Sequence, residues 1–109
     1  MDNLKTNEYY LNKIVADVEF MLEHTKGKSK NQIEENPLLV DSIMFRLVQI
    51  TENANKLTDE FKEENSNIPW RAIKGMRNRI VHNYGEINLD IVYDTVVNSI
   101  PELYKALKG

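Results

Sequence analysis

The chain of 109 residues contains no cysteine, which excludes a disulfide framework and any metal site built on thiolates. Its two histidines, His24 and His82, lie far apart in the sequence, so no dedicated zinc site is expected. No apolar run approaches the ~18 residues of a membrane span, and the N-terminus lacks the apolar segment of a signal peptide. We therefore expect a cytoplasmic protein that uses no metal or other cofactor.

Glycine and proline are also scarce, with four and three copies, and each stands where a helix could begin or end. Between these breaks, apolar residues recur at helical spacing over about 4–25, 37–57 and 89–107. Pro69 opens a further helix of medium length. Pro101 lies inside the last pattern and is expected to kink or split that helix.

Two shorter helices are predicted from capping residues. Ser29 and Gln32 have the spacing of a capping box, and Thr58 followed by acidic residues predicts a short polar helix that ends near Asn65. No segment alternates with the period of two that is typical of strands. These patterns predict one all-α domain over residues 1–109, an antiparallel bundle of four to six helices. A chain this short leaves much surface exposed, which favours an oligomer.

Positive charge is concentrated in one stretch, residues 70–84, which contains no acidic residue and carries Arg71, Lys74, Arg77 and Arg79. The whole chain has a formal charge of −3. Without these four, 10 basic residues stand against 17 acidic ones, a formal charge of −7. A basic island on an acidic protein indicates a local anion site rather than a general nucleic-acid coat.

Arg77 and His82 together could perform chemistry on a phosphodiester. An RNA strand carries its own nucleophile, the 2′-hydroxyl beside the scissile phosphate. Histidine can move a proton near pH 7, and the planar guanidinium donates to phosphate oxygens. The two positions lie about 140° apart on an ideal helix. We therefore expect the helix to end near Val81 and a second subunit to complete the site.

The arrangement of Arg77, Asn78, His82 and Tyr84 resembles the motif of the HEPN superfamily, most closely its HepT-like branch. That branch has Arg, four residues, His, one residue and Tyr. The segment Ile68-Pro69-Trp70 before the motif is also similar, and the resemblance covers roughly residues 8–107. Thr51 stands where the family has the glycine of an Ile-Gly-Glu segment, which puts a close approach of two helices there in question.

The resemblance implies the toxin of a toxin–antitoxin pair. Such toxins are metal-independent endoribonucleases that cleave RNA, and they form homodimers with the cleft between the two motif helices. The partner implied is a nucleotidyltransferase-fold antitoxin that neutralises the toxin by transferring AMP to the motif tyrosine, here Tyr84.

The resemblance also suggests roles for the individual residues. His82 would act as general acid or base, Arg77 would hold the scissile phosphate and Asn78 would help to orient it. Arg71, Lys74 and Arg79 would guide RNA without taking part in catalysis.

Other readings of the same residues stay open. Arg77 and His82 could be structural, and Glu52 could either pair with Arg77 or cap the seam of its helix. Trp70 is expected to anchor the core rather than to stack on a base. The alternative function is a non-catalytic subunit that binds a nucleotide or a nucleotidyltransferase partner, which the overall acidic charge favours.

Overall fold

A computed structural model describes residues 5–80 and 86–109, with the backbone alone for Arg77. Every element in this part of the chain is helical, and the order along the chain is α1 (Asn7–Thr25), α2 (Lys30–Glu34), α3 (Pro37–Asn55), α4 (Asp59–Glu64), α5 (Trp70–Ile80), α6 (Leu89–Asp94), the π-helical turn η1 (Thr95–Ser99) and α7 (Ile100–Lys108). The all-α prediction is confirmed. In the described ranges no helix is long and apolar enough to cross a membrane.

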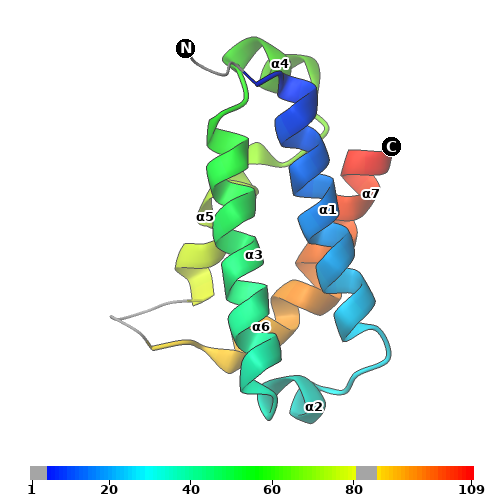
Figure 1. Cartoon of the computed structure of the whole chain (residues 1–109), viewed down its shortest axis with the longest axis vertical. Coiled ribbons are helices and arrows are strands. Elements are labelled where there is room, and N and C mark those ends of the chain that lie inside the picture. Colours follow the sequence, from blue (N-terminus) through cyan, green and yellow to red (C-terminus); the bar gives the residue numbers. More distant parts are fainter. Residues whose placement is uncertain (1–4, 81–85) are drawn as a thin grey trace.

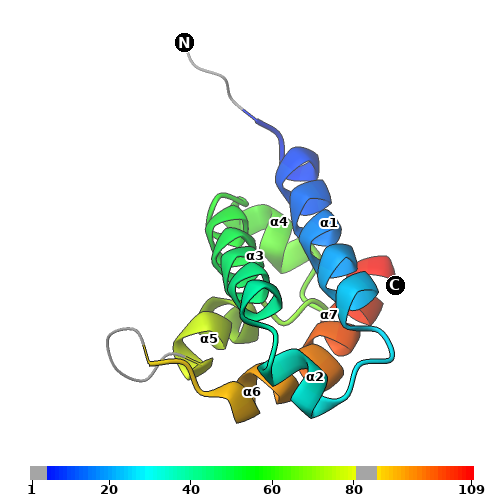
Figure 2. The ribbon, with the colours of Figure 1, turned by 60° about the horizontal axis from the view of Figure 1, so that its bottom comes forward.

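The helices run alternately down and up the long axis of the molecule (Figure 1). α1 packs against α3, α3 against α5, and the last helical stretch returns beside α1. With the bottom of the molecule turned forward, α1, α3, α5 and the last helical stretch surround a common interior (Figure 2). Their buried apolar side chains form one cluster. The two short helices close the ends of the bundle, with α2 at the bottom of Figure 1 and α4 at the top.

Five of the helices in the described residues begin at a side chain that accepts a hydrogen bond from the first turn. Thr6, Ser29, Asn36, Thr58 and Asn88 are the caps of α1, α2, α3, α4 and α6. The capping box predicted for α2 is present, because the backbone of each of its two residues donates to the side chain of the other. A free backbone N–H at a helix start needs such a partner. The caps predicted at Ser29 and Thr58 are confirmed.

The predicted apolar stripes form the core. Ile14, Val18 and Met21 of α1 and Ile43, Leu47 and Ile50 of α3 are all at most 1% exposed. From α5 and the last stretch, the buried side chains are Ile73, Met76, Ile80, Val92, Val96, Ile100 and Leu103. Burial of such stripes on neighbouring helices is the main source of stability in a helical bundle.

Two details differ from the sequence prediction. The first helix begins at Asn7, not near residue 4, because Thr6 takes the cap position. Seven α-helices occur in the described residues, against the predicted four to six. The difference arises at Pro101, where the backbone stays helical but widens into η1, so the last helix is counted as two. A π turn moves the hydrogen-bond register, which accommodates a proline without breaking the rod.

Candidate functional site

Helix α5 carries the first half of the predicted motif, Arg77 and Asn78, and its sides have different surroundings. Ile73, Met76 and Ile80 face the core. Trp70, at the start of the helix, is half-buried, and its indole nitrogen lies 3.1 Å from the backbone oxygens of both Lys62 and Asn65, to which it donates. The prediction that Trp70 anchors the core is therefore confirmed, and the anchor fixes where α5 begins.

The second half of the motif follows directly. His82 and Tyr84 lie outside the described residues, as does the side chain of Arg77. The described flanks of this segment are joined, because the backbone N–H of Asn88 donates to the oxygen of Ile80 at 2.8 Å. Asn88 also caps α6. The end of α5 and the start of α6 are thereby held together at the base of the segment that carries His82 and Tyr84.

On its side toward α3, helix α5 borders a hollow of about 260 Å³. Lys74 and Asn78, one turn apart on α5, form one wall, and Val48, Thr51 and Glu52 of α3 form the other. Lys74, Asn78 and Glu52 are exposed side chains, while Val48 and Thr51 are half-buried. The predicted site residues Lys74 and Asn78 therefore meet in one place, and Glu52 joins them from α3.

Thr51 forms a direct contact between the two helices that line the hollow. Its hydroxyl donates to the backbone oxygen of Ile73 in α5, at 3.4 Å between the oxygens. This is a long and therefore weak bond, but it runs directly from one helix to the other. α3 and α5 therefore contact each other at Thr51, where the hydroxyl meets a carbonyl of the facing helix.

Arg79 lies on the other side of α5. It is five residues beyond Lys74, about 140° round an ideal helix, and it lines a second hollow of about 250 Å³ toward α7 together with Gly75, Ser99 and Glu102. Its Nη2 atom is 3.7 Å from Oδ2 of Asp94. Of the three residues predicted to guide RNA, the structure brings Lys74 to the α3 side and Arg79 to the α7 side. Arg71 is exposed and lies one turn before Lys74.

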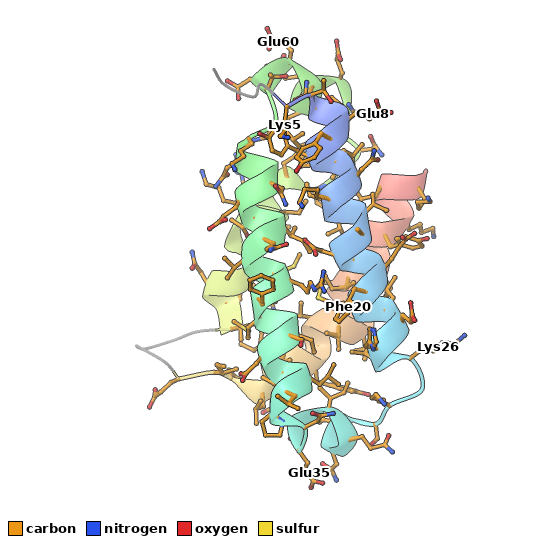
Figure 3. The ribbon with its side chains drawn as sticks, viewed as in Figure 1. Lys5, Glu8, Phe20, Lys26, Glu35 and Glu60 are labelled. Carbon is orange, nitrogen blue, oxygen red and sulfur yellow. The ribbon has the colours of Figure 1, made fainter. Side chains whose placement is uncertain are left out.

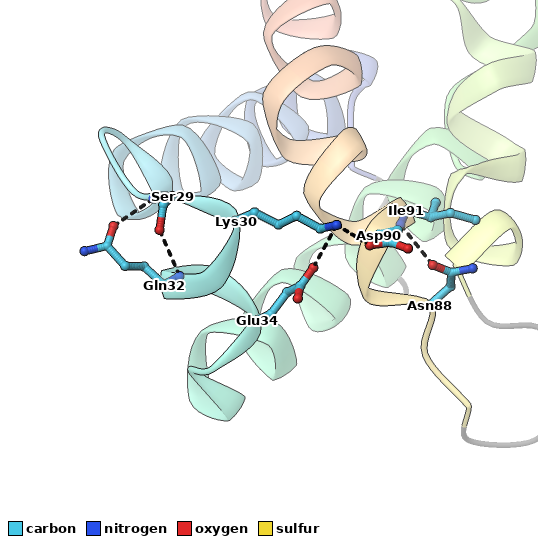
Figure 4. A network of polar contacts seen from close by, with 7 residues as sticks. All are labelled: Ser29, Lys30, Gln32, Glu34, Asn88, Asp90 and Ile91. Atoms are coloured by element: carbon cyan, nitrogen blue, oxygen red, sulfur yellow. Dashed lines mark hydrogen bonds and ion pairs between the residues drawn. The ribbon is translucent and has the colours of Figure 1, made fainter.

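A polar network supports α6 on its outer side (Figure 4). Lys30 of α2 forms ion pairs with Asp90 of α6 and with Glu34 of its own helix. The hydrogen bond to Asp90, together with the charge of that carboxylate, raises the pKa of Lys30 above its usual 10.5. The Lys30 and Asp90 side chains are 47% and 77% exposed, so their ion pair adds little stability. It does tie α2 to the helix that follows the motif segment.

A second charged pair, which the sequence analysis missed, lies between α1 and α3. Arg46 donates through Nη1 to Oδ1 of Asp17 at 2.8 Å, and the Asp17 side chain is only 4% exposed. The guanidinium also lies 3.8 Å from the ring centre of Phe20, which Figure 3 labels on the side of α1 toward α3. Asp17 lies in the apolar stripe of α1, three residues after Ile14 and four before Met21. A charged residue at such a position is the sequence signal that could have predicted a buried ion pair.

No group of three or more His, Cys, Asp or Glu side chains in the ranges 5–80 and 86–109 is placed to hold a metal ion. The charged and amide groups that line the α3–α5 hollow are the Glu52 carboxylate, the Lys74 ammonium and the Asn78 amide. This set suits a ligand with hydrogen-bond donors and acceptors together.

Comparisons with known proteins identify the family of the chain. A family model described as "Ribonuclease HepT-like" matches residues 14–109. A protein of Caldanaerobacter subterraneus subsp. tengcongensis that carries the name "putative RNase" is 36% identical over 105 residues, which are 96% of this chain and 94% of that protein. The "Probable ribonuclease HepT" of Thermococcus cleftensis is 27% identical over 99 residues, 91% of this chain and 90% of that protein. No solved structure matches the chain significantly. The chain belongs to the HepT-like ribonuclease family.

Proposed function

We propose that this chain is a metal-independent endoribonuclease that acts as the toxin of a toxin–antitoxin pair. The observation that carries the proposal is the family match over residues 14–109, because the family is described as ribonucleases. The arrangement of α5 supports it, since Lys74 and Asn78 line an open hollow beside the position of Arg77. A single-stranded RNA needs accessible cations and donors on the surface that binds it.

The motif residues would divide the work of one transesterification. Arg77 binds the scissile phosphate and stabilises the charge that builds on it as the 2′-hydroxyl attacks. His82 takes or gives the proton at the attacking or leaving oxygen, a task for which the imidazole side chain is suited because histidine in water titrates at about 6.5. Asn78 orients the phosphate. Arg71, Lys74 and Arg79 attract and guide the strand on both sides of α5.

The working unit is a homodimer in this proposal. Two large apolar side chains of α3, Leu38 and Phe45, are 80% and 57% exposed. They are seven residues apart and so share one face of the helix, and Glu52 continues this face a further seven residues on. A second copy covering Leu38 and Phe45 would bring the two α5 helices toward a common cleft.

The antitoxin partner is a nucleotidyltransferase-fold protein that transfers AMP from ATP to the hydroxyl of Tyr84 and releases pyrophosphate. Because Tyr84 is two residues from His82, the added group would block the cleft. Mass spectrometry of the toxin co-produced with its partner should find the adenylyl group on Tyr84, and Tyr84→Phe should remain unmodified.

The decisive experiment is incubation of the purified protein with total and transfer RNA in the presence of EDTA. We expect cleavage by the wild type and none by His82→Ala or Arg77→Ala. His24→Ala is the matched control, because His24 is exposed near the end of α1 and has no role in the proposal. Light scattering should show the same dimer for all four proteins. Cleavage that survives in His82→Ala would overturn the mechanism.

A second function remains specific enough to test, namely a non-catalytic subunit that binds a nucleotide or the nucleotidyltransferase. The charge of −7 outside the motif island favours it, because free RNA is repelled from most of the surface. A folded, unmodified dimer that cleaves no RNA in this assay would select this function instead.

A further inference from the structure

The hollow between α3 and α5 places two opposite charges around one space without pairing them. Glu52 contributes a carboxylate from α3 and Lys74 an ammonium from α5. Within the described residues, neither side chain forms an ion pair or hydrogen bond, whereas Lys30 and Arg46 both pair with nearby carboxylates. Both groups of the hollow are therefore available to the same ligand.

The size and walls of the hollow limit what that ligand can be. A water molecule takes up about 30 Å³ in the liquid, so a hollow of about 260 Å³ has room for a planar ring system. Val48 offers an apolar surface against which a ring face can pack. A bare phosphate is disfavoured, because the Glu52 carboxylate would repel it. The ligand must present donors to Glu52 and an acceptor to Lys74.

A nucleobase of unpaired RNA has these properties, and guanine fits them best. Its Watson–Crick edge presents the N1 and N2 hydrogens side by side, which one carboxylate can accept together, with the O6 acceptor directly adjacent. Adenine and cytosine each place an acceptor nitrogen next to one amino group. Uracil places two carbonyl oxygens around one N–H. Each of those three bases would set an acceptor against the Glu52 oxygens.

We propose that the α3–α5 hollow binds a guanine base of single-stranded RNA, with Glu52 accepting from N1–H and N2–H and Lys74 donating to O6. Asn78 links this pocket to the cleavage motif, since it lines the hollow and directly follows Arg77 in the chain. The guanine therefore belongs to a nucleotide next to the scissile phosphate. The proposal rests on RNA being the substrate and adds the base that selects the cleavage position.

Binding of short 2′-O-methyl oligonucleotides tests the pocket without cleavage, because they lack the nucleophilic hydroxyl. Fluorescence anisotropy would compare uridine oligomers that contain one central guanosine, inosine, adenosine or cytidine. Inosine keeps N1–H and O6 and lacks only the N2 amino group. We expect guanosine to be preferred about tenfold over inosine, in the range of one bidentate base contact.

Glu52→Gln is the variant that removes the carboxylate and keeps the size of the side chain. It should reduce the guanosine preference to less than about threefold and leave binding of plain uridine oligomers unchanged. Glu60→Gln, an equally exposed site on α4, should retain the full preference. Lys74→Met should weaken binding to every oligomer, and most strongly to those with guanosine or inosine.

The outcomes separate this proposal from the proposed function. Guanosine and inosine oligomers that bind within twofold of each other, or a preference that survives Glu52→Gln, would overturn the pocket even if the protein cleaves RNA. A Glu52-dependent guanosine preference in a protein that cleaves no RNA would support the pocket and reject the nuclease.

Discussion

Two sets of opposite charges lie between helix α3 and a neighbouring helix, and only one of them forms an ion pair. On the α1 side, Asp17 and Arg46 are joined at 2.8 Å, and the carboxylate is almost completely buried. On the α5 side, Glu52 and Lys74 face one hollow and are exposed. A buried carboxylate must have a partner, because water cannot solvate it. An exposed one is solvated already and can be reserved for a ligand. Burial therefore separates the structural pair from the candidate binding pair.

The largest expected effect comes from breaking the buried pair. Arg46→Met removes the guanidinium and leaves the Asp17 carboxylate in the core without its donor. We expect the free energy of unfolding in urea to fall by about 3 kcal/mol or more. The loss includes the contact of the guanidinium with the Phe20 ring.

A double variant, Asp17→Leu with Arg46→Met, removes both charges and should recover most of that stability. RNA cleavage per folded molecule should stay at the wild-type level in both proteins. If the single variant loses less than about 1 kcal/mol, Asp17 is better solvated than the structure indicates.

A smaller loss of stability is expected from a substitution at Thr51, which contacts α5 from α3. Thr51→Val keeps the shape of the side chain and removes the hydroxyl that donates to the Ile73 carbonyl. We expect a loss of about 0.5–1 kcal/mol in thermal or urea unfolding, because that bond is long. Thr51→Ser keeps the hydroxyl and serves as the control. A loss in Thr51→Ser with none in Thr51→Val would show that the methyl group, not the hydrogen bond, holds α3 and α5 together.

A substitution of Glu52, which faces Lys74 across the hollow, should hardly change the stability of the protein. Glu52→Gln changes an exposed side chain with no described partner, so the free energy of unfolding should change by less than about 0.5 kcal/mol. Asp17→Asn makes the same chemical change at the buried position and should cost several times more. This contrast between two carboxylate-to-amide changes tests the comparison directly. Comparable losses in urea at the two positions would contradict it.

The smallest effect concerns the exposed pair of Lys30 and Asp90. The raised pKa of Lys30 means that folding favours its charged form. The resulting stabilisation is fully present below pH 10.5 and is lost as the pH rises through the folded-state pKa. The difference in melting temperature between wild type and Lys30→Met should therefore be small at pH 8 and shrink further as the pH rises past 10.5 through the raised pKa of Lys30. Lys28→Met, at a neighbouring exposed lysine, is the control for the removal of one surface charge.

Much of the fold could be predicted because its signals are local. The caps at Ser29, Asn36, Thr58 and Asn88 and the buried stripes of α1 and α3 follow from hydrogen bonds and periodicity within one helix. The predicted number of helices was too low, and the difference arises near Pro101. A proline permits a kink, a break or a π turn, and the packing of the surrounding side chains selects among them.

The site was predicted only in part, and the reason lies in α5. The sequence placed its basic residues on one helix, but Lys74 and Arg79 border different hollows because α5 is packed between α3 and the last helix. The roles of Arg77, Asn78, His82 and Tyr84 remain proposals from the family motif. Glu52 had two possible readings in the sequence, and its position opposite Lys74 became visible only in the folded chain.

The amino-acid sequence by itself determined the helices, most of their starts, the core stripes and the motif that marks the family. These depend on interactions between residues at most a few positions apart, which the sequence states directly. The tertiary structure alone decided that Asp17 pairs with Arg46, that Thr51 reaches Ile73, and that Glu52 and Lys74 share a hollow. Such pairs join residues more than twenty positions apart, so they exist only after the helices have packed.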